Sequence, residues 1–392
     1  MPKANSKMVP IAVFDISSSS IAGAHALIPK GREDNPHVSI LASTRVFTEP
    51  KPDINIEQFV SSALTNIDAV ISTLHKADNH KPKDVHVLLA SPWFLSQSRT
   101  IIYTKTTSFI CTQKLIDSLI DKEITFVLEH DMGRFGSMGK EGTIIEKQIT
   151  KITLNGYTTN NPFGKKTQSL EVSLTVTVSP RQIIEGFKEH IHKGYGGAHI
   201  QFTTSPYATF IVARDFLKAP SEVMIVDIGE ETSDIAFIKN DLFLYQQSFP
   251  VGFYELYRQI ASTNRTTLSE TRALIETFRL GKLSAIMTSN VQKSLEASGE
   301  IWGKALVEHI GGDGSQIVKI PSNIYIVSLT PFSLFFSAYI EHDPFITHAV
   351  GATALTLTIL DNPTFKEHIS SLDPEQVDDT LGIGALFATR VL

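Results

Sequence analysis

The stretch that decides the fold is Val223-Met-Ile-Val-Asp-Ile-Gly-Glu-Glu-Thr-Ser-Asp-Ile-Ala-Phe-Ile238. It opens with a run of apolar, largely β-branched residues, which suits a strand that is buried on both faces. The run ends at Asp227-Ile-Gly229, crosses a polar segment and resumes after Asp234, which predicts a β-hairpin with a small, partly acidic turn. Such a turn either only reverses the chain or, with its backbone N–H groups and the hydroxyls of Thr232 and Ser233, binds a phosphate.

A second copy of this pattern lies near the N-terminus. The run Ile11-Ala-Val-Phe-Asp-Ile16 is followed by the turn Ser17-Ser-Ser-Ser20 and by a second apolar run, 21–28. Both copies contain an apolar run, Asp-Ile, a small polar turn, Ile-Ala and another apolar run. Two such hairpins, roughly 200 residues apart, predict a chain of two related halves, each of which offers one turn to a cleft between them.

The length and composition indicate an ordinary globular protein. The 392 residues are enough for two α/β domains with separate cores; 42% of them are hydrophobic and 19% are charged. The formal charge of −6 gives no electrostatic reason to expect a nucleic-acid partner. The single cysteine, Cys111, excludes an internal disulfide framework and a multi-cysteine zinc site. No signal-peptide pattern and no run of about eighteen apolar residues is present, so we expect a cytoplasmic protein.

The paired hairpins resemble the first and second phosphate-binding hairpins of the actin-like ATPase superfamily. The resemblance covers residues about 11–360 and implies an α/β fold of duplicated, ribonuclease H-like lobes, with ATP and Mg²⁺ in the cleft. Between the hairpins the sequence predicts a strand, a helix and two strands, at 100–105, 112–128, 146–154 and 170–178. This order resembles the strand-helix-strand-strand (SHS2) module of the bacterial division protein FtsA, and the pilus protein PilM has a related module.

The resemblance divides the chain into two lobes, an inserted module and a tail. The expected boundaries are 1–94 and 180–219 for the first lobe, 95–179 for the module, 220–250 and 320–372 for the second lobe, 251–319 for its helical subdomain, and 373–392 for an acidic linker and an apolar tail. The tail segment 380–392 has one positive charge, whereas a helix on a membrane surface usually has several. It either contacts the membrane or docks on the protein or on a partner.

The resemblance also implies a set of site residues. Those expected to meet the nucleotide phosphates and a metal are Asp15, Ser17, Ser18, Ser19, Asp227, Gly229, Thr232 and Asp234. Asp15 and Asp227 would hold Mg²⁺ only together with a nucleotide; alternatively, each carboxylate is a turn former that hydrogen-bonds its own backbone. The residues expected around adenosine are Ser328, Leu329, Thr330 and Arg272.

The site departs from the family pattern at several places. Ser17 stands where the first turn usually has glycine, and Glu230 and Glu231 stand where the second turn usually has glycines. Leu329-Thr-Pro331 contains no Gly-Gly pair, and Arg272 stands near a ribose-binding position. Each like-charge contact near 4 Å between a carboxylate and a phosphate costs about 1 kcal/mol in water and about 4 kcal/mol at an intermediate dielectric. These changes predict weak or absent nucleotide binding, and no catalytic residue is predicted.

The resemblance therefore favours a scaffold over an enzyme. We expect an FtsA-like assembly protein in cell division, which works at the cytoplasmic face of the membrane, associates with itself and tethers a tubulin-like division protein. The first alternative is a PilM-like component of a type IV pilus machine, which captures a short peptide of an inner-membrane protein. The second alternative is an active ATPase or kinase of the same superfamily. No nucleic-acid partner is expected.

Overall fold

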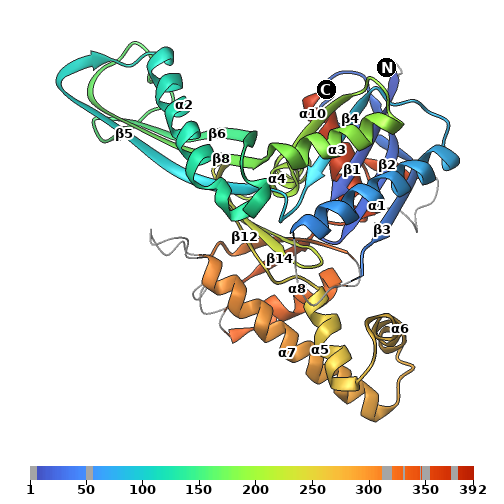
Figure 1. Cartoon of the computed structure of the whole chain (residues 1–392). Coiled ribbons are helices and arrows are strands. Elements are labelled where there is room, and N and C mark those ends of the chain that lie inside the picture. The colour runs from blue at the N-terminus through green and yellow to red at the C-terminus, as the bar shows by residue number, and fades with distance from the viewer. Residues whose placement is uncertain are drawn as a thin grey trace, which may run out of the picture.

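Two lobes and a projecting arm make up the molecule (Figure 1). The structure is a computed structural model, which describes residues 7–49, 56–310, 320–329, 332–344, 346, 354–371 and 378–392. Each lobe is built on its own β-sheet with helices packed against it, and the arm has a separate sheet. The mixed α/β architecture agrees with the predicted fold class.

The first lobe contains the N-terminal hairpin. Strand β1 (Met8–Ile16) pairs antiparallel with β2 (Ser20–Pro29) and parallel with β4 (Asp84–Leu89). One face of the sheet is covered by α1 (Ile56–Ala77) and α3 (Arg181–Gly194), whose apolar residues recur at helical spacing. The order across the sheet is β15 (Ile369–Ser371), β3 (Val38–Phe47), β2, β1, β4 and β9 (His199–Thr204).

The second lobe contains the central hairpin, whose strands are buried on both faces as predicted. Met224 and Val226 of β10 (Glu222–Ile228) point to one core, while Val223 and Ile225 point to the other, because successive side chains of a strand alternate. The order across the sheet is β12 (Leu242–Phe249), β11 (Ser233–Lys239), β10 (Glu222–Ile228), β13 (Asn323–Ser328) and β14 (Thr356–Ile359). The helices of this lobe are α5 (Tyr254–Asn264), α6 (Leu268–Arg279), α7 (Ala285–Ile310) and α8 (Phe332–His342).

The arm has the predicted chain order of strand, helix, strand and strand. Its elements are β5 (Leu95–Ile110), α2 (Gln113–His130), a 3-10 helix (Met132–Met138), β6 (Gly142–Leu154), β7 (Tyr157–Thr158) and β8 (Lys166–Pro180). The hydroxyl of Thr112 accepts a hydrogen bond from the N–H of Leu115 and caps α2. The apolar face of α2 packs on the sheet. On the opposite face, the hydroxyls of Ser98 and Thr175 donate to the carbonyl oxygen of Leu244, which joins the arm to β12.

A half-buried carboxylate joins the arm to the first lobe. Glu146 on β6 accepts hydrogen bonds from the hydroxyl of Thr203 (2.6 Å) and from the N–H of Thr204 (2.7 Å), where α4 (Ser205–Leu217) begins. Burial, partly opposed by these hydrogen bonds, raises the pKa of Glu146 to about 7. A carboxyl group whose pKa is raised by folding favours the folded state while it is protonated. The contribution of Glu146 to the free energy of unfolding is therefore lost as the pH rises from about 4.5 to about 7.

We expect Glu146→Gln to remove this pH dependence. The unfolding free energy of the wild type should fall relative to that of the variant as the pH rises from about 5 to about 8, because only the wild type then buries a charge. Urea unfolding of both proteins across this range measures the difference. The control is Glu129→Gln on the exposed face of α2. Parallel pH profiles for the wild type and Glu146→Gln would contradict the expectation.

The C-terminal segment returns to the first lobe. Residues 369–371, expected in the second lobe, form β15 and pair with β3. Helix α10 (Asp379–Val391) then packs against α4 and the β1–β2 face, and its side chains from Thr380 to Thr389 are buried. Of the two alternatives for residues 380–392, the structure has the docked one, in which the apolar side chains of this segment fill the core between the lobes. Linker residues 373–377 lie outside the described part.

Within the described ranges, no helix is both long enough and apolar enough to cross a bilayer.

Candidate functional site

The turns of the two hairpins face each other where the lobes meet. The sequence predicts that both turns line one cleft, and the structure places them in direct contact. The N–H of Ser17 donates to the carbonyl oxygen of Ser20, and the N–H of Gly229 donates to that of Thr232, each at 3.0 Å. The indole N–H of Trp93 also donates to the carbonyl oxygen of Ser17. Both turns therefore have a fixed backbone.

Glu230 of the second turn is bound by the serines of the first turn. Its Oε2 atom accepts hydrogen bonds from the hydroxyls of Ser17 (2.7 Å) and Ser18 (3.2 Å) and from the N–H of Ser19 (3.3 Å). The N–H of Glu231 donates to the hydroxyl of Ser18 at 3.0 Å. Glu230 is 1% exposed, so water is excluded from this contact. A carboxylate of the chain thus lies where these donors would otherwise meet a phosphate oxygen.

A guanidinium group occupies the space beside Asp15. Arg45 on β3 donates from Nη2 to Oδ2 of Asp15 (2.6 Å) and from Nε to Oδ2 of Asp378 (2.5 Å). The hydroxyl of Thr380 donates to the same oxygen of Asp15 at 2.9 Å. Asp378 caps the N-terminus of α10 by accepting a hydrogen bond from the N–H of Thr380. This ion-pair cluster therefore attaches the C-terminal helix to the first hairpin.

The two carboxylates that share Arg45 differ in the direction of their pKa shifts. Burial raises the pKa of Asp15, and the nearby guanidinium offsets only part of this effect. Burial acts in the same direction on Asp378, but Arg45, which contacts both of its oxygens, and Thr380 together outweigh it and lower the pKa of Asp378. Asp378 is thus the more strongly ionised partner, and the predicted metal ligand Asp15 already faces a cation.

The second predicted metal ligand, Asp227, also has an internal partner. It accepts a hydrogen bond from the hydroxyl of Ser205 at 2.5 Å. The pKa of Asp227 is raised well above its usual value. Burial is the larger cause, and repulsion from Asp234 is the second. Asp234 accepts hydrogen bonds from the N–H (3.0 Å) and the hydroxyl of Ser91, and burial raises its pKa as well. Thr232 donates to the carbonyl oxygen of Ser91. With raised pKa values, these carboxyl groups are harder to ionise than ordinary ones in the absence of a nearby cation.

The predicted adenosine residues make contacts within the protein. The hydroxyl of Ser328 donates to the carbonyl oxygen of Ile228, and Leu329 packs against the core of the second lobe. The guanidinium of Arg272 lies over the ring of Phe47, 5.3 Å from its centroid, beside a hollow of about 220 Å³ between the lobes. Thr330 lies outside the described residues.

Groups of the protein itself already contact the residues that were expected to meet Mg-ATP. The turn that would bind phosphate holds Glu230, and the carboxylate that would face Mg²⁺ holds Arg45. In the part of the chain that the structure describes, no group of three or more His, Cys, Asp or Glu residues is arranged to hold a metal ion.

Sequence reasoning missed the residues that complete these contacts. They are Arg45, Ser91, Ser205, Arg258 and Asp378, of which Arg258 forms an ion pair with Glu231. Most lie far along the chain from their partners, and one arginine in a strand-like run is a weak signal. The usable signal is the pair of glutamates in the second turn, because buried carboxylates require donors or cations nearby.

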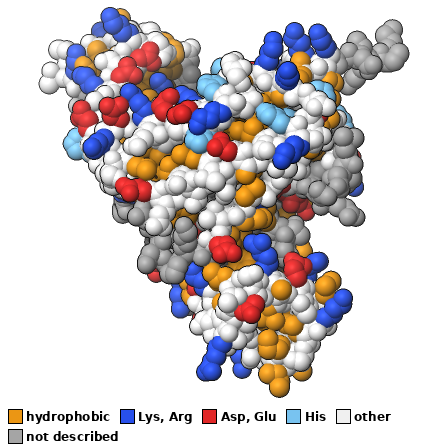
Figure 2. Space-filling view, turned by 45° about the vertical axis from the view of Figure 1, so that its right-hand side comes forward, with side chains coloured by type: hydrophobic (Ala, Val, Ile, Leu, Met, Phe, Trp, Pro, Cys, Tyr) orange, Lys and Arg blue, Asp and Glu red, His pale blue; other side chains and the backbone are white. Residues whose placement is uncertain are grey.

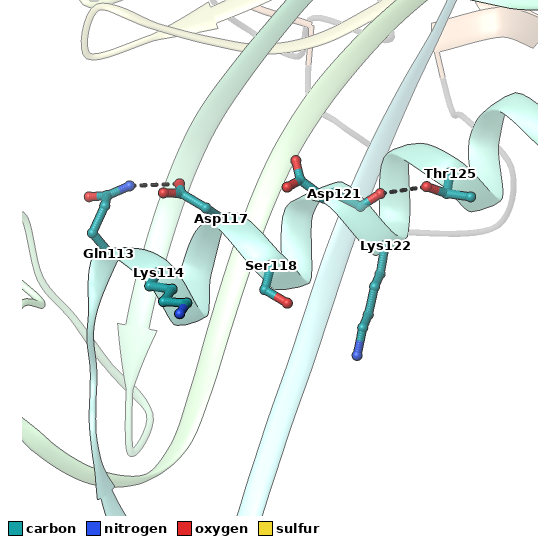
Figure 3. Close-up of a pocket in the computed structure, with 7 residues that line it drawn as sticks. All are labelled: Gln113, Lys114, Asp117, Ser118, Asp121, Lys122 and Thr125. Atoms are coloured by element: carbon teal, nitrogen blue, oxygen red, sulfur yellow. Dashed lines mark hydrogen bonds between the residues drawn. The ribbon is translucent and has the colours of Figure 1, made fainter.

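A second hollow lies on the arm, away from the two turns, and is lined by polar side chains alone. It measures about 700 Å³ and runs along α2 (Figure 3). Its lining residues are all polar and lie on one helix face: Gln113, Lys114, Asp117, Ser118, Asp121, Lys122 and Thr125. Gln113 donates to the Asp117 carboxylate and Thr125 donates to the Asp121 carbonyl oxygen. Charged side chains of both signs are scattered over the arm, among uncharged and hydrophobic ones, in the space-filling view (Figure 2). This face is a solvated helix surface.

Together the lobes, the arm and the paired turns define a two-lobed actin-like fold with an inserted module. No protein-family model and no curated protein matches the sequence. The chain is similar to the solved PilM-PilN type IV pilus biogenesis complex at 14% identity, with a TM-score of 0.62 over 98% of this chain and 97% of that chain. It is also similar to the ethanolamine utilization protein EutJ from Carboxydothermus hydrogenoformans, at 12% identity and a TM-score of 0.45 over 98% and 92% of the chains. The chain shares its fold with that pilus-complex structure, in agreement with the actin-like fold that the hairpins indicated.

Proposed function

We propose that this protein is a nucleotide-independent assembly protein of the PilM type. It would capture a short segment of an inner-membrane protein at the cytoplasmic face of the membrane. The observation that carries the proposal is the occupied cleft, in which Glu230 takes up the donors of the serine turn. Donors that are already bonded to the protein cannot position a triphosphate for reaction, because catalysis requires them to be directed at the reacting group. The function is then expected on the surface of the molecule.

The arm offers a surface that suits an extended segment. Among the described residues, β5 pairs with β8 on one side and forms the edge of its sheet on the other. Ile102 and Ile110 on this strand are 67% and 59% exposed. An extended peptide can add a strand to such an edge through backbone hydrogen bonds, while its side chains contact the apolar residues beside it. The solved PilM-PilN complex supports a protein as the partner.

The two other candidate functions have less support. An FtsA-like role at the membrane would be favoured by a tail free to contact lipid, and here α10 is buried between the lobes. An ATPase or kinase would need a phosphate-binding turn that is open to substrate, and here the turn is bonded to Glu230. We therefore favour the pilus-type role over a division role with a tubulin-like partner.

Calorimetric titration of the full chain tests the proposal. We expect Mg-ATP to give no saturable binding in the micromolar range and no turnover, because Glu230 and Arg45 occupy the positions of phosphate and cation. Peptides from the cytoplasmic segments of single-span membrane proteins encoded beside this gene should bind with the same Kd with and without Mg-ATP. Peptide binding on the same sample shows that the protein is folded. Micromolar Mg-ATP binding with hydrolysis, or no binding by any of the peptides, would refute the proposal.

A further inference from the structure

The contact between Glu230 and the first turn has the chemistry of an anion-binding site. Two hydroxyls and one backbone N–H converge on a single carboxylate oxygen, at 2.7, 3.2 and 3.3 Å. Turns that direct N–H groups and hydroxyls at one point bind phosphate oxygens in the same way. Ser17, Ser18 and Ser19 are all buried, so the donors are removed from water and require an acceptor. The serine turn is therefore built to hold an anion.

The second lobe holds the backbone of Glu230 in a fixed position. The N–H of Tyr254 donates to the carbonyl oxygen of Glu230 (2.8 Å), and the N–H of Phe253 donates to that of Gly229 (2.9 Å). A Cβ atom on Gly252 would lie 2.3 Å and 2.4 Å from these two oxygens, so only glycine permits the close approach. The Glu230 carboxylate is thus presented to the serines by a rigid support.

A ligand that belongs to the chain has an advantage over one in solution. A tethered group acts at an effective concentration of about millimolar even on a flexible linker, and a rigid support avoids the loss of conformational entropy as well. A free anion must also displace a carboxylate that is 1% exposed. The wild-type turn is therefore closed to small anions under ordinary conditions.

We propose that the Ser17–Ser19 turn is an oxyanion site and that Glu230 is its permanent intramolecular ligand, which connects the two lobes without a bound small molecule. Removal of the Glu230 side chain would leave these donors unpaired in a site of the right chemistry for a tetrahedral oxyanion such as inorganic phosphate. The inference rests on the proposed function, since it explains why the scaffold needs no nucleotide.

Thermal unfolding of the full-length Glu230→Ala variant tests the inference. In sodium chloride the variant should have a lower Tm than the wild type. Inorganic phosphate at equal ionic strength should raise the Tm, and at ten times its Kd it should lower the unfolding equilibrium constant about elevenfold. The wild type should show no specific response to phosphate. The matched control is Glu231→Ala, which removes the adjacent carboxylate that pairs with Arg258, and it should also show no response.

The response of Glu230→Ala to phosphate can be read even if this variant does not fold in chloride. If Glu230→Ala is unfolded in chloride, folding on addition of phosphate supports the site in the same way. Adding Ser17→Ala and Ser18→Ala to Glu230→Ala should abolish the response, because two of the donors are then absent. A Glu230→Ala variant that responds to phosphate no more than the wild type does, or whose response survives loss of both hydroxyls, would overturn it. Binding of Mg-ATP to the wild type would instead refute the proposed function, so the two failures are distinguishable.

Discussion

A chain that ends before Asp378 is expected not to fold. Loss of α10 removes from the core between the lobes four side chains that are at most 2% exposed: Leu381, Ile383, Leu386 and Phe387. Burial of one such side chain stabilises by about 1.5–3 kcal/mol, so together they contribute about 6–12 kcal/mol. The stability of a whole domain is about 5–15 kcal/mol. Circular dichroism and gel filtration of the truncated chain test this, with removal of the exposed Leu392 alone as the control.

Gly384→Leu separates core docking from membrane binding in the same helix. A Cβ atom at Gly384 would lie 2.5 Å from Cγ1 of Val13 and 3.1 Å from Cδ1 of Leu88, so a leucine overpacks the core and destabilises by about 1–3 kcal/mol. The same change adds apolar surface and helix propensity, which would strengthen a helix that lies on lipid. A lower Tm supports docking. An unchanged Tm with increased liposome flotation, or a truncated chain that folds, would contradict the first expectation.

The elements that the sequence predicted well are those with a repeated local pattern. The two hairpins share an apolar run, Asp-Ile and a small polar turn, and the two runs of the central hairpin are buried on both faces. The arm follows from alternation in its strands and from helical spacing in α2. Segment 380–392 could not be placed, because an apolar composition suits a core and a membrane surface equally. Only the fold creates the close contacts at Gly382 and Gly384, and these contacts favour docking in the core over a membrane surface.

The site was predictable in its position but not in its contacts. Two glutamates in the second turn indicate a cleft that is poorly suited to a triphosphate, since their charge has the same sign as that of phosphate. The sequence does not show that Glu230 reaches serines more than 200 residues away, or that Arg45 reaches Asp378. Such pairings depend on how the lobes are packed against each other. Local patterns contain no information about that packing.

Arg45→Met is expected to lower the unfolding free energy by about 3–5 kcal/mol at about pH 8, the usual result of breaking a buried ion pair. The substitution keeps much of the volume of the side chain but leaves Asp15 and Asp378 facing each other without a cation. Arg45 is 8% exposed along its side chain, so water cannot replace the lost donors. Urea unfolding measures the loss. Arg181→Met, which breaks an exposed ion pair with Glu141, is the matched control and should change stability by less than about 1 kcal/mol.

The pH dependence of this loss identifies its cause. In the wild type, the lowered pKa of Asp378 contributes stability that is present above the ordinary carboxyl range and is lost as the pH falls. In Arg45→Met, burial without a cation raises the pKa of both carboxyl groups, so the variant is penalised at high pH and relieved by protonation at low pH. The difference between the two proteins should therefore shrink from about pH 8 to about pH 5. Asp378→Asn added to Arg45→Met should recover part of the loss at the higher pH. A pH-independent difference would instead assign the effect to lost packing of the Arg45 side chain.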